Sequence, residues 1–421
     1  MADSLTAAII AVGSELLTPH KTDTNSLVIS EVLNDLGIAV GFKSVVGDSR
    51  DELTAHLSHA MARHTIVILC GGLGPTDDDL TRDVVAELLR LPMDEDPGIV
   101  AAMQKRFAAR GWKMPEVNRR QAQVPRGAAV LENPHGTAPG LWLETGHHQL
   151  ALLPGPPREM KPMMDGAVRQ RLAAVAGGVR LHRRLVRVAG KGESAVEEIV
   201  QPIYSQWVQR PPRIETTILA GLGQVELHLV TQSVDAAVAN AALDSAVAQL
   251  ADALGHDLVS IDGTVLEAVV GGLLRQRGWW VAFAESCTGG LATSRMTDIA
   301  GSSEYVERSI VAYSNRAKIE LLDVPESLIR EHGAVSEAVA AAMAAGIRRR
   351  AQVNAGIGIT GIAGPGGGSE RKPVGTVCIA VDAGESSVRT FTFPGGRDMV
   401  KHLAATWAID MLRRWLIKSL P

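Results

Sequence analysis

The sequence predicts an α/β protein whose first part is a mostly parallel sheet. Short apolar runs at residues 7–12 and 65–70 are typical of buried strands, and residues 25–36 between them have helical periodicity. Ser49 and Glu52 have the spacing of a capping box, which predicts the start of a second helix. Because strands and helices alternate, we expect helices on both faces of the sheet and ligands beyond the carboxyl ends of its strands.

Two further modules follow the first. Strand-like stretches at residues 184–188 and 224–231, with a helix across residues 236–254, predict a small α+β module. An α/β alternation then returns, with strands expected at residues 279–284, 310–313, 355–360 and 374–381 and a closing helix at 398–416. A chain of 421 residues fits two to four domains. We predict three, spanning residues 1–169, 170–258 and 259–421.

The composition is that of a packed globular protein, with 46% hydrophobic and 21% charged residues. A formal net charge of -4 argues against a general nucleic-acid binder, because phosphate neutralisation needs a basic face. Cys70, Cys287 and Cys378 lie too far apart for metal-ligand spacing, which suits a reducing compartment. No secretory signal and no apolar run of membrane-spanning length is visible. We therefore expect a cytoplasmic protein that contacts neither nucleic acid nor membrane.

The most specific local signal lies where an apolar strand turns into a helix, at Ala284 to Gly290. Amides of a first helical turn can hold an oxyanion, so Ser286 is the candidate nucleophile. The candidate substrate contacts around it are Glu285, Cys287, Thr288, Gly289 and Gly290. The alternative is an ordinary helix N-cap formed by a serine or threonine.

A second strand end supplies groups that could activate a serine. Tyr313 and Lys318 follow the strand expected at residues 310–313. A hydroxyl nucleophile needs a base, and a desolvated lysine can act as one while a tyrosine relays the proton. The alternative is a solvated lysine and a tyrosine at the edge of the core.

A glycine-rich loop between two expected strands is the third candidate element. Thr360 and Gly361 begin it, and glycines there let backbone amides approach a ligand closely. Arg371 and Lys372 in the same loop could contact a phosphate. The alternative is a flexible hairpin loop.

Residues 262–418 resemble the C-terminal domain of the CinA family. The resemblance is carried by Glu285-Ser-Cys-Thr-Gly-Gly290, Asp298-Ile-Ala-Gly-Ser-Ser303, Tyr313-Ser-Asn315 with Lys318, His332-Gly-Ala-Val-Ser336, Gly361-Ile-Ala-Gly-Pro365 and Lys372-Pro-Val-Gly-Thr376. It implies a deamidase that hydrolyses nicotinamide mononucleotide to nicotinic acid mononucleotide and ammonia without a cofactor. Ser286 then matches the nucleophile, Lys318 and Tyr313 its proton-handling partners, and Thr360 the pocket wall.

Cys287 competes with Ser286 for the role of nucleophile. A thiolate is the better nucleophile, and a helix N-terminus would lower the pKa of Cys287. A cysteine mechanism would require a nearby histidine, and His332 is the one within these motifs. We favour Ser286. Glu285 could orient the lysine or the ribose, or be structural.

Three consecutive aspartates, Asp77, Asp78 and Asp79, follow a glycine-rich strand end in the first part of the chain. Carboxylates so close repel one another unless a cation lies between them, so a hard metal such as Mg²⁺ bridging to a phosphate is plausible. The alternative is helix capping by Asp77 or Asp79.

Residues 5–168 resemble the molybdopterin-binding-like domain at the front of CinA proteins, on Gly13-Ser-Glu-Leu-Leu17, Asp23-Thr-Asn25, Cys70 to Arg82 and Pro154 to Met160. The resemblance implies a three-layer α/β/α fold and a metal-dependent ADP-ribose pyrophosphatase. The nucleotide site would comprise Gly13, Glu15, Asp23, Asn25, Gly71, Gly72, Gly74, Thr76, Pro154 and Gly155. The middle module occupies the place of the family's KH-like domain, and we infer no RNA binding for it because the chain is acidic.

The sequence therefore predicts a bifunctional hydrolase with nicotinamide mononucleotide and ADP-ribose as ligands, assembled as a homodimer. The alternative is a non-catalytic regulatory protein that binds a pterin or a nucleotide.

Overall fold

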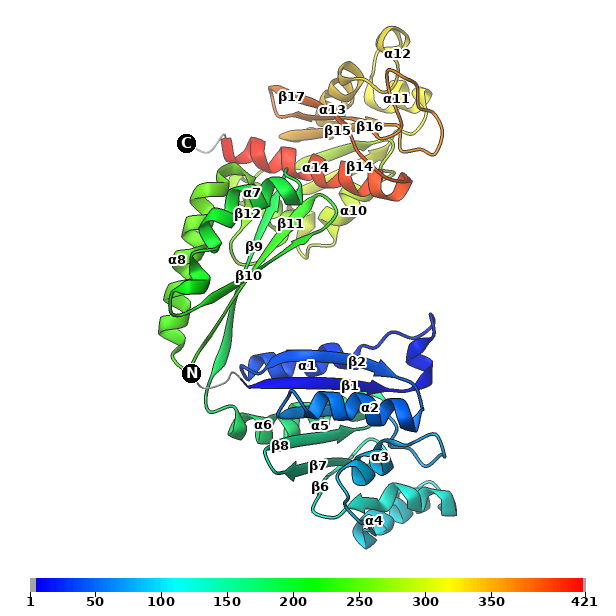
Figure 1. The fold of residues 1–421 in the computed structure, drawn as a ribbon. Coiled ribbons are helices and arrows are strands. Elements are labelled where there is room, and N and C mark those ends of the chain that lie inside the picture. The colour runs from blue at the N-terminus through cyan, green and yellow to red at the C-terminus, as the bar shows by residue number, and fades with distance from the viewer. Residues whose placement is uncertain (1–4, 419–421) are drawn as a thin grey trace. The chain divides into compact units, whose positions relative to one another are not determined.

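The structure, a computed structural model, describes residues 5–418 and groups the chain into two units. One unit holds the chain up to His182 together with residues 232–237, and the other holds residues 183–231 and 238 onward (Figure 1). Each unit has hydrophobic cores of its own. The middle and C-terminal segments, which the sequence analysis separates at residue 258, thus share one unit.

The first unit contains a six-stranded sheet in the order β2-β1-β3-β8-β7-β6. Neighbours among the first four strands are parallel, and β7 and β6 are antiparallel additions at one edge. The strands are β1 (Thr6–Val12), β2 (Ala39–Val46), β3 (Ile66–Cys70), β6 (Ala129–Leu131), β7 (Gly140–Thr145) and β8 (His148–Leu153), with a separate ribbon of β4 (Met93–Glu95) and β5 (Gln123–Pro125).

Helices cover both faces of this sheet, so the predicted three-layer α/β/α fold is confirmed (Figure 1). Alternate residues of β1 explain the two cores, because side chains of a strand point to opposite faces. Ile10 packs with the core of α2 and α3, whereas Ile9 packs with that of α1 and α5. The helices are α1 (Asn25–Asp35), α2 (Arg50–Met61), α3 (Thr81–Leu88), α4 (Pro97–Ala108), α5 (Pro157–Met163) and α6 (Arg169–Val175).

The middle segment is a four-stranded sheet in the order β10-β11-β9-β12, covered by two helices. Its elements are β9 (Arg180–Ala189), α7 (Glu193–Tyr204), β10 (Ile214–Ala220), β11 (Gln224–Ser233), α8 (Ala236–Leu254) and β12 (Leu258–Ser260). The sequence analysis missed β10 and β12. The α+β character is confirmed, and a KH-like identity stays a prediction.

The C-terminal segment is a five-stranded sheet in the order β14-β13-β15-β16-β17, again between two helical layers. β13 is parallel to both β14 and β15, whereas β16 and β17 are antiparallel. The strands are β13 (Val281–Glu285), β14 (Val306–Val311), β15 (Ala355–Gly361), β16 (Thr376–Asp382) and β17 (Ser386–Thr392). The helices are α9 (Leu266–Arg277), α10 (Leu291–Thr297), α11 (Asn315–Leu322), α12 (Glu326–His332), α13 (Glu337–Ala351) and α14 (Arg397–Lys418).

A buried arginine on α14 joins the C-terminal segment to the middle one. Arg413 donates to Asp410 Oδ1 at 2.7 Å and to the carbonyls of His256 and Leu258 at 2.7 and 2.6 Å. Both charged side chains are 1% exposed. Because a buried charge must be hydrogen-bonded, this network explains why the two segments form one unit.

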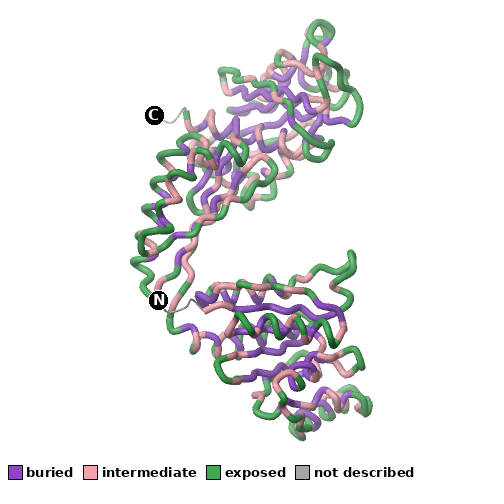
Figure 2. The backbone as a smooth tube through the Cα atoms, in the orientation of Figure 1, coloured by how far each residue is buried: buried purple, intermediate pink, exposed green. Residues whose placement is uncertain are grey.

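The strands β1, β3, β13, β15 and β16 are buried along almost their whole length, and Figure 2 shows where buried backbone lies in each unit. Within residues 5–418, the helices all fall short of the length and apolar character that crossing a lipid bilayer requires.

Candidate active site

Ser286 lies directly after the central parallel strand of the C-terminal sheet. Its amide donates to the carbonyl of Ile359 on β15 at 3.0 Å, which fixes the chain as it leaves β13. Gly289 and Gly290 complete the turn with φ of +65° and +95°, a conformation that disfavours side chains with a Cβ. The serine is thereby held at the edge where the parallel strands end, where ligands of α/β sheets collect.

Lys318 contacts Ser286 directly. It lies on α11, which Ser314 caps by accepting from the amide of Ala317. The Nζ of Lys318 is 3.1 Å from Ser286 Oγ and also donates to the carbonyls of Ala312 at 2.9 Å and Tyr313 at 3.3 Å. These three partners are all uncharged oxygens.

The ammonium form of Lys318 is disfavoured by its surroundings. The side chain is buried, with the residue 2% exposed, and burial lowers its pKa. Ser286 is 7% exposed. A lysine that is neutral more readily than usual, next to a serine hydroxyl, has the geometry and the protonation behaviour of a general base.

Glu285 has a structural environment that differs from the substrate contact we expected. Its carboxylate is fully buried and accepts from the amides of Gly290, Ala292 and Thr293, and from Thr293 Oγ1 at 2.7 Å. It thus saturates the N-terminal turn of α10 from the preceding strand. The structure places Glu285 as a support for the serine turn.

This arrangement also changes which amides could hold an oxyanion. The Gly289 amide donates to the carbonyl of Ser286 at 3.2 Å, and the Gly290 amide is taken by Glu285. The amides of Cys287 and Thr288 donate to no backbone carbonyl in the described part of the chain, and both lie beside the Cys287 sulfur. The fully buried Thr288 also has a hydroxyl without a hydrogen-bond partner among residues 5–418.

The environment of Cys287 opposes a nucleophilic thiolate. We expected a helix N-terminus to lower its pKa, but burial raises the pKa of this thiol to about 12. The residue is 5% exposed and packs in the hydrophobic core with Phe283 and Ile359. Desolvation outweighs the nearby amides, so the structure favours Ser286 over its neighbour.

The hydroxyl of Tyr313 lies away from the Ser286–Lys318 pair. The tyrosine is 62% exposed, and its hydroxyl accepts from Arg397 Nη2 at 2.9 Å. Only its backbone carbonyl contacts Lys318. No direct contact supports the proton relay expected from the sequence, because the side chain follows the end of β14 and turns outward.

Two of the candidate side chains in the glycine-rich loop are hydrogen-bonded within the protein. Lys372 Nζ donates to the carbonyls of His332 and Val335 at 2.9 and 2.6 Å, and Thr360 Oγ1 donates to the carbonyl of Ala334 at 2.8 Å. These bonds fasten the loop before α13 to the sheet edge. The Nζ of Lys372 is therefore held by two backbone carbonyls, whereas we expected it to contact a phosphate.

The other candidate residues of this region are either packed inside the protein or exposed to solvent. At Gly361 a Cβ would come within 3.0 Å of the Cys287 sulfur, so that glycine permits close packing. Arg371 is exposed and remains available to a ligand. The environment of His332 includes Glu331, whose carboxylate lies 3.7 Å from its Nε2.

Two cationic residues at the start of α14 were missed by the sequence analysis. Arg397 Nη1 donates to the carbonyl of Gly364 at 2.9 Å, besides its bond to Tyr313. Lys401, one turn later, has its Nζ 4.0 Å from where a Cβ of Gly289 would lie. The signal was the glycine pair before Arg397, which brings a helix N-terminus and its cations to this edge.

In the first unit, a cavity of about 540 Å³ lies at the ends of β1, β3 and β8. Most of the predicted nucleotide-site residues line it, namely Gly13, Glu15, Asp23, Asn25, Gly71, Gly72, Gly74, Pro154 and Gly155. Thr76 and Asp77 do not. Asn25 Nδ2 donates to the carbonyl of Gly155 at 2.7 Å, while its Oδ1 is buried without a partner among the described residues.

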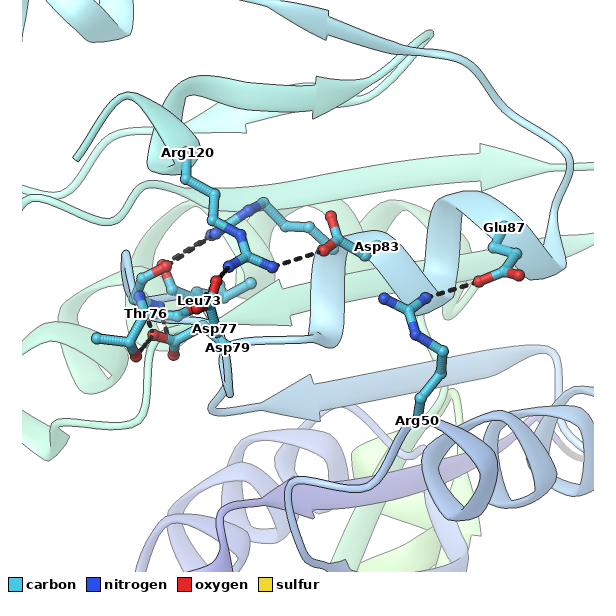
Figure 3. Close-up of polar contacts among 10 residues, drawn as sticks. Arg50, Leu73, Thr76, Asp77, Asp79, Asp83, Glu87 and Arg120 are labelled. Carbon is cyan, nitrogen blue, oxygen red and sulfur yellow. Dashed lines mark hydrogen bonds and ion pairs between the residues drawn. The ribbon is translucent and has the colours of Figure 1, made fainter. Parts of the chain in front are cut away.

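Figure 3 shows two of the three aspartates, Asp77 and Asp79, engaged by different neighbouring groups. Asp79 accepts from the amides of Gly74 and Thr76 at 2.7 and 2.9 Å, and Asp77 accepts from Arg120 at 2.8 Å. Among residues 5–418, no group of three His, Cys, Asp or Glu side chains is placed to hold a metal ion. The expected metal set of Asp77, Asp78 and Asp79 therefore does not fit, because two of its carboxylates are already satisfied.

Asp78 and Asp79 of that set line the cavity, whereas Asp77 does not. The hydrogen bond from Thr76 lowers the pKa of Asp78, so Asp78 carries a negative charge at neutral pH. Asp48 and the buried Glu159 line the same cavity. The amides of Gly71 and Gly74 are already bonded to the Leu153 carbonyl and to Asp79, and Lys21 is the cationic residue in the lining.

Known proteins and protein families match both the N-terminal and the C-terminal parts of the chain. Residues 263–416 match the family model "CinA C-terminal domain", and residues 8–174 match the model "Probable molybdopterin binding domain". CinA-like proteins of Koribacter versatilis and Acidobacterium capsulatum are 44% and 45% identical to the chain, covering 98% of it and 100% of each relative. The crystal structure of the competence/damage inducible protein CihA from Agrobacterium tumefaciens is 39% identical over 35% of this chain and 92% of its own, with a TM-score of 0.34.

Proposed function

Because the chain belongs to the CinA family, we propose that its C-terminal segment hydrolyses the carboxamide of nicotinamide mononucleotide to nicotinic acid mononucleotide and ammonia. The observation that carries this proposal is the 3.1 Å contact between Lys318 Nζ and Ser286 Oγ in a buried site. Acyl transfer by a serine requires such a base, and burial keeps the lysine neutral more readily.

The reaction proceeds through an acyl-enzyme. Ser286 Oγ attacks the carboxamide carbon while Lys318 takes the hydroxyl proton, and the amides of Cys287 and Thr288 stabilise the oxyanion. Lys318 returns the proton to the departing nitrogen as the C–N bond breaks and ammonia leaves. Water then attacks the ester with Lys318 as base, which releases the carboxylate product and restores the serine.

Substrate phosphate is bound at the start of α14. Lys401 lies beside the turn that follows Ser286, and Arg397, one helical turn earlier, donates to the glycine loop at Gly364. Both carry the charge that a phosphate requires. Arg371, exposed on the glycine loop, adds a third cation. Lys372 supports the loop instead.

Product analysis in ¹⁸O water tests the chemistry. We expect one ¹⁸O atom in the new carboxylate of nicotinic acid mononucleotide and ammonia in equal amount. Release of free nicotinamide would instead indicate cleavage of the glycosidic bond. A folded protein that leaves the nucleotide unchanged would favour the non-catalytic, regulatory interpretation.

The N-terminal cavity supports a second activity, hydrolysis of ADP-ribose. The supporting observation is Asn25, which lines this cavity together with Lys21 and whose buried Oδ1 has no hydrogen-bond partner among the described residues. These groups suit a ribose hydroxyl and a pyrophosphate. Because the three aspartates do not form a metal site, ADP-ribose binding should not depend on a metal ion. Asn25→Ala should therefore weaken this binding both with and without a chelator. The assignment would be contradicted if a chelator abolished ADP-ribose binding by the wild type while Asn25→Ala bound ADP-ribose as tightly as the wild type.

A further inference from the structure

A second cavity in the C-terminal segment lies away from Ser286. It has a volume of about 560 Å³ and is formed between the first half of β17 and the last turns of α14. Its lining includes His256, Ser387, Arg389, Met411, Trp415 and Lys418. In Figure 1 both elements are drawn in red tones near the end of the chain.

The cavity lies at the end of the sheet opposite the serine turn. β13 and β15 are parallel, and Ser286 follows the end at which β15 reaches Gly361. β16 runs back from there, so Asp382 pairs with Gly356 and Ser386 pairs with Asp382 at the far end. α14 begins with Arg397 near the serine turn and ends at this cavity. The two sites are therefore distinct.

The charge of the cavity is predominantly positive. Arg389, Arg414 and Lys418 line it against a single acid, Glu385. Arg414 is neutralised by Asp410 and Asp257, at 2.6 and 2.8 Å.

Arg389, by contrast, is not neutralised by an acid. No ion pair or hydrogen bond to its guanidinium is present within residues 5–418, and it lies 5.3 and 5.9 Å from the rings of Phe391 and Trp407. Such a cation, which lines the cavity and lies over two aromatic rings, is suited to an anion.

The rest of the cavity lining consists of apolar side chains and serine hydroxyls. Met411 is 6% exposed, and the indole of Trp415 packs 5.3 Å from the ring of Trp279. The hydroxyls of Ser386 and Ser387 lie at the rim. An apolar wall beside cations and hydroxyls matches a ligand with a planar ring at one end and a phosphate at the other.

We infer that this cavity is a third nucleotide site, which binds a nucleoside monophosphate with its phosphate on Arg389 and Lys418 and its base along Met411 and Trp415. The inference stands independently of the deamidase proposal. The occupant is a small phosphate ester, and inorganic phosphate alone would reach only half of the contacts.

Calorimetric titration of the full chain with adenosine 5′-monophosphate tests this inference. We expect Arg389→Ala to raise the dissociation constant about tenfold, the usual effect of losing one charge-assisted hydrogen bond. Ser387→Glu, which adds a negative charge at the rim, should weaken binding at least as much. Arg330→Ala, an exposed arginine on α12, is the matched control and should leave binding unchanged.

Three outcomes of the nucleotide titration would overturn the inference. They are no binding of adenosine 5′-monophosphate to the wild-type chain at millimolar concentration, an affinity within twofold of wild type in both variants, and equal weakening in Arg330→Ala. Adenosine or inorganic phosphate binding as tightly as the nucleotide would also contradict it, since both halves of the cavity are required. An unfolding temperature of Arg389→Ala close to that of wild type shows that the variant is folded.

Discussion

The Nζ of Lys318 lies 3.1 Å from the Oγ of Ser286, and neither side chain has a carboxylate partner at this contact. A serine–lysine pair without an acid differs from a triad, because no negative charge holds the base in its protonated form. Burial alone lowers the pKa of the lysine.

The activity should therefore follow the titration of Lys318. We expect kcat/KM to rise with pH through a pKa below the 10.5 of an ordinary lysine, because the neutral amine is the base. Lys318→Met should abolish the activity and the pH profile together. Activity that falls as the pH rises through this range would contradict the role of base.

The same lysine should make stability depend on pH. The unfolded chain holds a proton that the folded chain releases, so the free energy of unfolding should increase with pH between the lowered pKa and 10.5. Urea unfolding at a series of pH values measures this slope. Lys318→Met should flatten it, whereas Lys161→Met, at an exposed position, should leave it unchanged.

Glu285 should act as a positioning residue for Ser286. Glu285→Gln replaces an acceptor by a donor facing the amides of α10, and we expect the free energy of unfolding to fall by about 1–3 kcal/mol. Steady-state kinetics should show a lower kcat with little change in KM. Glu320→Gln on the exposed face of α11 is the control. Wild-type kcat in Glu285→Gln would exclude this role.

Lys401 should contribute to phosphate binding. We expect Lys401→Ala to raise the KM for nicotinamide mononucleotide about tenfold, by loss of a charge-assisted hydrogen bond. Nicotinamide riboside lacks the phosphate, so its hydrolysis should be equally slow in wild type and variant. An equal loss with both substrates would indicate a general structural effect instead.

The buried pair of Arg413 and Asp410 should stabilise the unit that joins the middle and C-terminal segments. Arg413→Met leaves buried carbonyls and Asp410 without this donor, and we expect a loss of about 3 kcal/mol in the free energy of unfolding. The exposed pair of Arg350 and Asp323 offers a control, because Arg350→Met should cost less than about 1 kcal/mol. Similar losses in both variants, measured by urea unfolding, would contradict the distinction.

The proximity of Ser286 and Lys318 followed from the sequence because both come after neighbouring parallel strands, whose ends share one edge. The direction of the Tyr313 side chain did not, since it depends on how the chain turns beyond Val311. Asp77 to Asp79 were misinterpreted for a related reason. Their partner Arg120 lies about forty residues away in a segment without a strong pattern.

The edge strand β17 was missed because its sequence is mostly polar. Val388 packs on one face of the sheet and Phe391 on the other, and serine, arginine and threonine fill the other positions. The sequence of β17 therefore contains no apolar run. The position of this strand is evident only from its pairing with β16. The cavity beside it could not be predicted for the same reason.

Ammonia release from nicotinamide mononucleotide by wild type, Ser286→Ala and Cys287→Ala is the most direct test of the serine mechanism. The account predicts that Ser286→Ala is inactive and that Cys287→Ala retains activity, because burial raises the pKa of the Cys287 thiol to about 12. Both variants should unfold at temperatures close to that of wild type. Full activity in a folded Ser286→Ala, with loss in Cys287→Ala, would contradict the account and make the cysteine the nucleophile.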